Sequence, residues 1–280
     1  MRDRLPTNDA KPAVKPKSFK IAKPVFTEQP LGKNGKRPFY KRDPLTSAFF
    51  IILVFFASQV GAGLIIAIYP ALKNWTSSQG ADWLSNSVIA QFIYILLAET
   101  FAVWLVLWLL KRAHIAKSKI GLIRPAFKDI LYALCGYGAY FVCYFIIVAV
   151  ASHFTALNVD QSQKIGFDGA SGKQLYYVFA SLVILPPIAE EIMFRGYLFT
   201  SFRQKFRLRY AVILTSILFG IAHLQFGSGA PLLWVAALDT FTLSCVLCTL
   251  REKSGSLWPG IYLHALKNGV AFVALFHTRF

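Results

Sequence analysis

Residues 184–196 read Ile-Leu-Pro-Pro-Ile-Ala-Glu-Glu-Ile-Met-Phe-Arg-Gly, so two adjacent carboxylates stand inside an apolar run. A charged side chain at the centre of a bilayer costs about 2.5–3.5 kcal/mol on insertion scales, so an ionisable residue there is a candidate functional residue. Glu191 and Arg195 are spaced i,i+4, which predicts that they share a helix face and pair. Glu190 then points about 100° away, toward the interior of a helical bundle.

The composition around this stretch is typical of a membrane protein. Of the 280 residues, 56% are hydrophobic and 15% are charged, and the mean hydropathy is +0.51. A soluble domain is about 45–50% apolar and 25% charged. The apolar runs show no alternation of the kind expected for barrel strands, and lipid offers no water to the backbone, so helices remain. We therefore predict an all-α, polytopic transmembrane helical bundle with about seven spans.

Most of the seven apolar runs reach the roughly 20 residues that a spanning helix needs, and the fifth is the shortest. The runs are Leu45–Leu72, Ser87–Leu110, Ile130–His153, Leu175–Phe202, Tyr210–Leu224, Pro231–Leu250 and Ser256–Phe276. The fourth run contains a Pro186-Pro187 pair, which predicts a break or kink just before the two glutamates.

The basic residues, which give a net charge of +17, are grouped between these runs. They concentrate at the N-terminus and after the second, fourth and sixth runs, whereas the opposite loops are nearly free of them. The positive-inside rule then places the N-terminus in the cytoplasm. Because the clusters punctuate apolar segments and form no continuous stripe, we expect no nucleic-acid partner. We expect a multi-pass protein of a prokaryotic cell membrane, embedded in the lipid bilayer.

Two parts of the chain differ in composition. Residues 1–44 contain seven prolines and 12 basic residues but no apolar segment, which predicts a disordered, basic, Pro-rich cytoplasmic tail. Residues 45–280 are predicted to form the membrane domain.

The predicted orientation converts residue number into depth in the membrane. At a rise of ~1.5 Å per residue, four polar residues lie roughly 17–22 Å from the nearest cytoplasmic basic marker on their span. They are Glu190, His223, His264 and Asn268. Three separate spans are therefore expected to bring acids, imidazoles and an amide into one layer.

Two further acids, Glu99 in the second run and Asp239 in the sixth, belong to the same layer. We interpret them as packing residues or as partners for a buried cation, either Arg195 or Lys267. No separate function is assigned to them from the sequence.

The layer contains the groups needed to hydrolyse an amide or ester inside the bilayer. A desolvated glutamate beside a neutral histidine can take a proton from water, and a second histidine and an asparagine can donate hydrogen bonds to an oxyanion. Glu190, His223 and His264 could alternatively bind a divalent metal such as zinc, although the chain has no H-E-x-x-H motif. The sequence leaves open whether the protein needs a metal or no cofactor.

Three motifs in this order resemble the CPBP family of intramembrane endopeptidases. They are Glu190-Glu191-x-x-x-Arg195, Phe219-x-x-x-His223 and His264-x-x-x-Asn268. That family includes CAAX-processing proteases, which act on prenylated proteins, and bacterial proteins linked to bacteriocin processing or self-immunity. The resemblance covers about residues 115–276.

The resemblance implies a role for each motif residue. Glu190 would be the general base that activates water, with His223 assisting, and His264 and Asn268 would form the oxyanion site. Glu191 and Arg195 would support the geometry. The family has been described both as metal-dependent and as metal-independent glutamate proteases.

We therefore predict an intramembrane endopeptidase that cuts a membrane-associated protein or peptide. One alternative is an ion-coupled transporter that uses the intramembrane acids, but only one run has a Pro-Pro break, whereas transporters commonly have broken helices in both halves. The other alternative is a non-catalytic scaffold or immunity protein with the same fold.

Overall fold

The computed structural model describes residues 43–154, 166–224 and 234–279. Within these ranges all regular structure is helical, and each of the seven apolar runs falls on a helix, so the predicted helical membrane bundle is confirmed. The tail predicted for residues 1–44 lies almost wholly outside the described residues. The start of the sixth run, residues 231–233, also lies outside them.

The first half of the chain forms five helices. They are α1 (Pro44–Ile66), α2 (Ile68–Leu72), α3 (Ser77–Asn86), α4 (Val88–Arg112) and α5 (Phe127–Phe154). A 3₁₀ turn at Lys117–Ile120 precedes α5.

The second half begins with one long composite helix. It consists of α6 (Gln174–Phe179), η3 (Ala180–Ile184), α7 (Leu185–Glu190), η4 (Glu191–Leu198) and α8 (Phe199–Arg203). The remaining helices are α9 (Leu208–Ala222), α10 (Trp234–Ser254) and α11 (Trp258–Phe276), followed by a 3₁₀ turn at His277–Arg279.

Five stretches are long and apolar enough to cross a membrane. They are Pro44–Leu72, Val88–Arg112, Phe127–His153, Gln174–Arg203 and Trp234–Ser254. Of the other two runs, α9 has 15 residues and α11 has 19. The count of seven spans and the cytoplasmic N-terminus therefore stay predictions.

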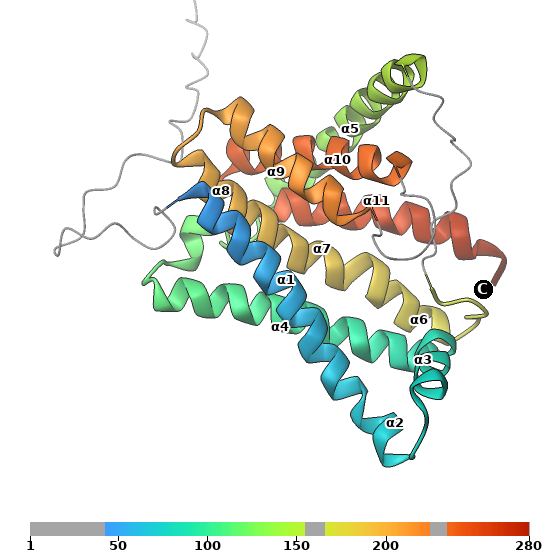
Figure 1. The fold of residues 1–280 in the computed structure, drawn as a ribbon. Helices are drawn as coiled ribbons and strands as arrows, with labels where there is room; N and C mark the ends of the chain where they lie inside the picture. Colours follow the sequence, from blue (N-terminus) through green and yellow to red (C-terminus); the bar gives the residue numbers. More distant parts are fainter. Residues whose placement is uncertain (1–42, 155–165, 225–233, 280) are drawn as a thin grey trace, which may run out of the picture.

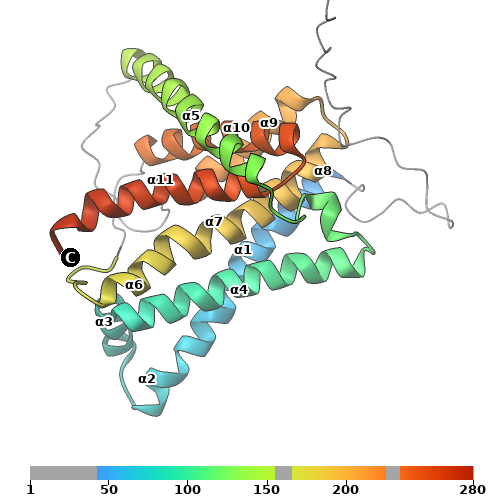
Figure 2. The same cartoon turned by 180° about the vertical axis from the view of Figure 1, so that it is seen from behind.

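The composite helix Gln174–Arg203 lies in the middle of the bundle. In Figures 1 and 2 it runs, in yellow, between α1 and α4 on one side and the red and orange helices α9–α11 on the other. In the most apolar 18-residue window of this helix, 50% of the residues are buried. The same share is 56% in α10 but only 17–28% in the first three spans. The outer helices can face lipid with apolar side chains, whereas the central ones keep their polar groups away from it.

The Pro186-Pro187 pair does not break the fourth span, because helix continues from Gln174 to Arg203. The disturbance instead takes the form of two π-helical segments, η3 before α7 and η4 after it. Proline has no N–H to offer the preceding turn, and the N–H of Leu185 bonds back to the carbonyl of Ala180, five residues earlier. Such π segments are frequent at functional sites.

Candidate active site

The Glu191–Arg195 pair forms as the spacing predicted. Arg195 Nη1 lies 2.8 Å from Glu191 Oε1, and the two side chains are 0% and 1% exposed. The Arg195 guanidinium also lies over the Phe219 ring, 4.3 Å from its centroid. Removing one partner of such a pair would leave an uncompensated buried charge. The pair therefore fixes the first turn of η4 against α9.

Gly260 allows α11 to approach this pair closely. A Cβ at Gly260 would lie 2.5 Å from Glu191 Oε2, which is closer than real Cβ contacts come. Only glycine leaves room for the Glu191 carboxylate between η4 and α11. The sequence analysis missed this residue, and its only local signal is a glycine in the first turn of the helix that carries His264.

His264 lies between the two glutamates and is 5% exposed. Its Nε2 is 3.8 Å from Glu190 Oε2, and its Nδ1 is 3.5 Å from Glu191 Oε1. Both distances exceed those of a direct hydrogen bond, and such bonds often tighten only when substrate is bound. One imidazole thus connects the predicted base to the buried ion pair.

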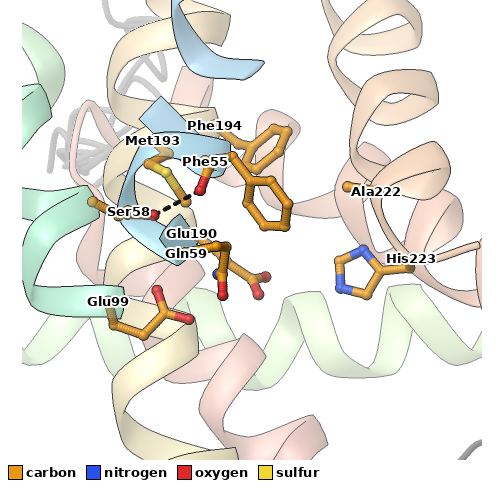
Figure 3. A pocket seen from close by; sticks show the side chains of 10 residues that line it. Phe55, Ser58, Gln59, Glu99, Glu190, Met193, Phe194, Ala222 and His223 are labelled. Carbon is orange, nitrogen blue, oxygen red and sulfur yellow. Dashed lines mark hydrogen bonds between the residues drawn. The ribbon is translucent and has the colours of Figure 1, made fainter. Parts of the chain in front are cut away.

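Glu190 and His223 line one cavity of about 70 Å³. A water molecule needs about 10–15 Å³ of such volume, so the cavity has room for more than one. Figure 3 shows the Glu190 carboxylate between Glu99 on one side and the His223 ring on the other. Glu190 Oε2 is buried and has no hydrogen-bond partner among the described residues. The lining consists of Phe55, Ser58, Gln59, Glu99, Ala102, Glu190, Met193, Phe194, Ala222 and His223.

His223 is held at the C-terminal end of α9 by its own helix. Its Nδ1 lies 2.8 Å from the Phe219 carbonyl oxygen, and its ring packs on the Phe219 ring with the centroids 4.6 Å apart. A carbonyl only accepts hydrogen bonds, so Nδ1 carries the hydrogen and Nε2 of the neutral ring has a free lone pair. His223 can therefore accept a hydrogen bond from water in the cavity.

Asn268 makes a different contact from the one expected. Its side-chain amide donates to the Leu182 carbonyl oxygen at 3.0 Å. In a helix this carbonyl would accept from residue 186 or, in a π turn, from residue 187, and both are prolines without an N–H. Asn268 thus supplies the missing donor and attaches α11 to the composite helix, and it is not among the residues that line the cavity.

Of the two further acids, Asp239 has the cation partner suggested for it. Lys267 Nζ lies 2.5 Å from Asp239 Oδ2, and the Tyr140 hydroxyl donates to the other carboxylate oxygen. Glu99 instead faces the cavity. The structure therefore gathers Glu190, His223 and Glu99 around one space. The sequence analysis placed Glu99 in the same layer but gave it no role at a protease site.

A metal does not fit these residues as they stand. Within residues 43–154, 166–224 and 234–279, no three His, Cys, Asp or Glu side chains are gathered closely enough to hold an ion. The set Glu190, His223 and His264 falls under this finding.

Comparisons with known proteins agree on a membrane protease. A family model described as type II CAAX prenyl endopeptidase, Rce1-like, matches residues 172–270, which contain all three motifs. The Bacillus subtilis (strain 168) protein named "Putative membrane peptidase YdiL" is 25% identical over 225 residues, covering 79% of this chain and 85% of that protein. No solved structure gives a significant match. Over residues 172–270 the chain is thus similar to CAAX-type endopeptidases, and this match, the relative and the helical membrane bundle together support an intramembrane protease.

Proposed function

We propose that the protein is an endopeptidase in which Glu190 and His223 activate a water molecule to attack a peptide carbonyl. The observation that carries the proposal is that both side chains line one cavity with room for water, while Glu190 Oε2 has no hydrogen-bond partner among the described residues. A carboxylate and a neutral imidazole on opposite sides of a water are suited to general-base catalysis.

The first step is the addition of water to the carbonyl. Glu190 takes a proton from the water, and the Nε2 lone pair of His223 accepts its second hydrogen as a hydrogen bond and so orients it. The water oxygen then bonds to the carbonyl carbon, and the carbonyl oxygen becomes an oxyanion. We assign His264 as the donor to this oxyanion through Nε2, with hydrogen on both ring nitrogens, because Nε2 lies 3.8 Å from Glu190 Oε2 while Nδ1 faces the acceptor Glu191 Oε1 at 3.5 Å.

Glu191, Arg195 and Asn268 act indirectly in this proposal. The buried Glu191–Arg195 pair contacts His264 at Nδ1 and so sets the position of the ring. Asn268 was expected to share the oxyanion site, and its bond to Leu182 supports a role in holding α11 at the height that brings His264 to Glu190. We propose a membrane-associated protein or peptide as substrate, since the base lies on a helix apolar enough to cross the bilayer.

The test is cleavage of a membrane-tethered peptide library by the purified protein in liposomes, with and without a chelator. Glu190→Gln should abolish cleavage, and His223→Ala should reduce it by roughly 10²-fold or more. Asp82→Asn, which removes an exposed carboxylate on α3, serves as the control and should cleave like wild type. Cleavage retained in a folded Glu190→Gln variant would refute the assignment, and loss on chelation would show that a metal takes part.

A transporter that uses Glu99, Glu190 and Asp239 as one cation site is less well supported. Asp239 is paired with Lys267 and bonded to Tyr140, so its charge is already compensated. Ion flux in the same liposomes that depended on Glu190 would favour the transporter. An immunity phenotype that survived loss of both Glu190 and His223 would favour a non-catalytic protein.

A further inference from the structure

Glu99 is the second carboxylic acid of the cavity, and it belongs to none of the three motifs. It projects from α4, which lies beside the composite helix in both views of the bundle. Figure 3 shows its carboxyl group turned toward Glu190 across the cavity. The two acids thus approach the same space from two different helices.

Little around Glu99 stabilises a negative charge. No hydrogen bond or ion pair is found for its carboxyl group in the part of the chain that the structure describes, and no Lys or Arg is among the residues that line the cavity. Of the neighbouring polar groups of α1, Ser58 donates to the Phe55 carbonyl and the Gln59 side-chain oxygen accepts from Tyr94, so the uncharged Gln59 NH2 group is the donor that α1 offers to the cavity. The other groups that line the cavity, apart from Glu190 and His223, are apolar.

Glu190 has the more favourable surroundings for a negative charge. His264 Nε2 lies 3.8 Å from its carboxylate, and the His223 ring faces it from α9. Two carboxylates that face one small cavity repel each other, and this repulsion favours the state in which the pair holds one proton. The environment favours a charged Glu190 and a protonated, neutral Glu99.

We propose that Glu99 is the general acid of the reaction and donates its proton to the leaving amine. This inference rests on the proposed function and adds the residue that completes it. Glu190 takes one proton from water while the water oxygen bonds to the carbonyl carbon. As the oxyanion re-forms the carbonyl, the C–N bond breaks and the nitrogen takes the proton of Glu99.

The products of this step are a carboxylic acid and an amine, and the two catalytic groups have exchanged protonation states. Glu190 is left protonated and Glu99 ionised. Transfer of the proton from Glu190 to Glu99 through the water of the cavity restores the starting state. The carboxyl pair therefore both activates the nucleophile and assists the leaving group, and it neither gains nor loses protons over a cycle.

The test compares two probes based on a peptide bond that the protein cleaves in the library. Both probes carry the same acyl group and differ only in the leaving group. One probe is the peptide amide, whose amine must be protonated to leave, and the other is the matching phenyl ester, whose phenolate leaves without help. Glu99→Gln should lower the amide rate by roughly 10²–10⁴-fold and the ester rate by less than about tenfold. Glu190→Gln should lose both activities, because both need activated water.

The control is Thr100→Val, which alters the exposed neighbour of Glu99 on α4 and should leave both rates at wild-type values. An unchanged amide rate in Glu99→Gln, or an equal loss on both probes in a folded variant, would overturn the role of Glu99. If Glu99→Gln does not accumulate in the membrane, Glu99→Asp replaces it. The shorter acid should lower the amide cleavage rate more than the ester cleavage rate, and equal losses of the two rates would overturn the role of Glu99. Activity retained in Glu190→Gln would instead overturn the proposed function itself.

Discussion

The buried Glu191–Arg195 pair offers the sharpest test of the site's construction. We consider Glu191→Gln and Arg195→Met, singly and together. Both side chains are almost completely buried, so each single change leaves the partner charge uncompensated, at a cost of about 3–5 kcal/mol. Arg195→Met also removes the contact with the Phe219 ring, which adds up to about 2 kcal/mol.

The double variant should be much less unstable than the sum of the single variants. It removes the charge of both partners and leaves side chains of similar volume, and replacing buried ion pairs in this way is often close to neutral. The interaction energy between Glu191 and Arg195 should therefore be at least about 3 kcal/mol, the upper end of the range found for residues in contact. Reversible unfolding in mixed detergent–SDS micelles, followed by circular dichroism, gives the four free energies of unfolding.

The Arg203–Glu252 pair is the matched control, because it has the same chemistry, an N–O distance of 2.7 Å and greater exposure, 14% for each side chain. Arg203→Met and Glu252→Gln should show a smaller interaction energy than the Glu191–Arg195 pair, because both side chains keep contact with solvent. Additive effects at Glu191 and Arg195, with an interaction energy no larger than in this control, would refute the view that an ion pair holds η4.

Three further changes follow from the same contacts, each measured as a free energy of unfolding in the same micelles and as the cleavage rate. Asn268→Leu should cost about 1–3 kcal/mol, because the Leu182 carbonyl is left without a donor; no loss would contradict that contact. Gly260→Ala should cost about 1–3 kcal/mol and slow cleavage, because its methyl group would strike the Glu191 carboxylate; wild-type activity would show that the carboxylate has room to move. Lys267→Met should lower the free energy of unfolding by about 1–2 kcal/mol, a value reduced because both side chains are partly exposed. Replacing its aspartate partner on α10 as well should recover part of this loss, because no unpaired charge then remains.

The elements of the fold were predictable because apolar runs of membrane length leave the backbone few solutions other than helix. The pairing of Glu191 with Arg195 was predictable from spacing alone, since it lies within one helix. The rise per residue from a basic marker predicted a similar height for Glu190 and His223, and the two side chains do line one cavity.

The sequence alone did not predict how each helix is rotated about its axis or how closely the helices pack. Glu99 had the right depth, but only the packing of α4 against α7 turns its carboxyl group into the cavity. The need for glycine at position 260 exists only because α11 meets the carboxylate of another helix. The partner of Asn268 did leave a local signal, namely the two prolines four and five residues after Leu182, which the sequence analysis interpreted only as a break.

The proline pair therefore influences the site through a hydrogen bond rather than through a bend. Pro186 and Pro187 deprive the Leu182 carbonyl of both its helical donors, and an unpaired carbonyl is costly where no water reaches it. The amide of Asn268 supplies a donor from α11, and that bond sets the height of the helix one turn from His264. His264 lies on α11 between both glutamates. The unpaired carbonyl of Leu182 on the composite helix therefore helps to hold the His264 ring next to Glu190, the proposed base.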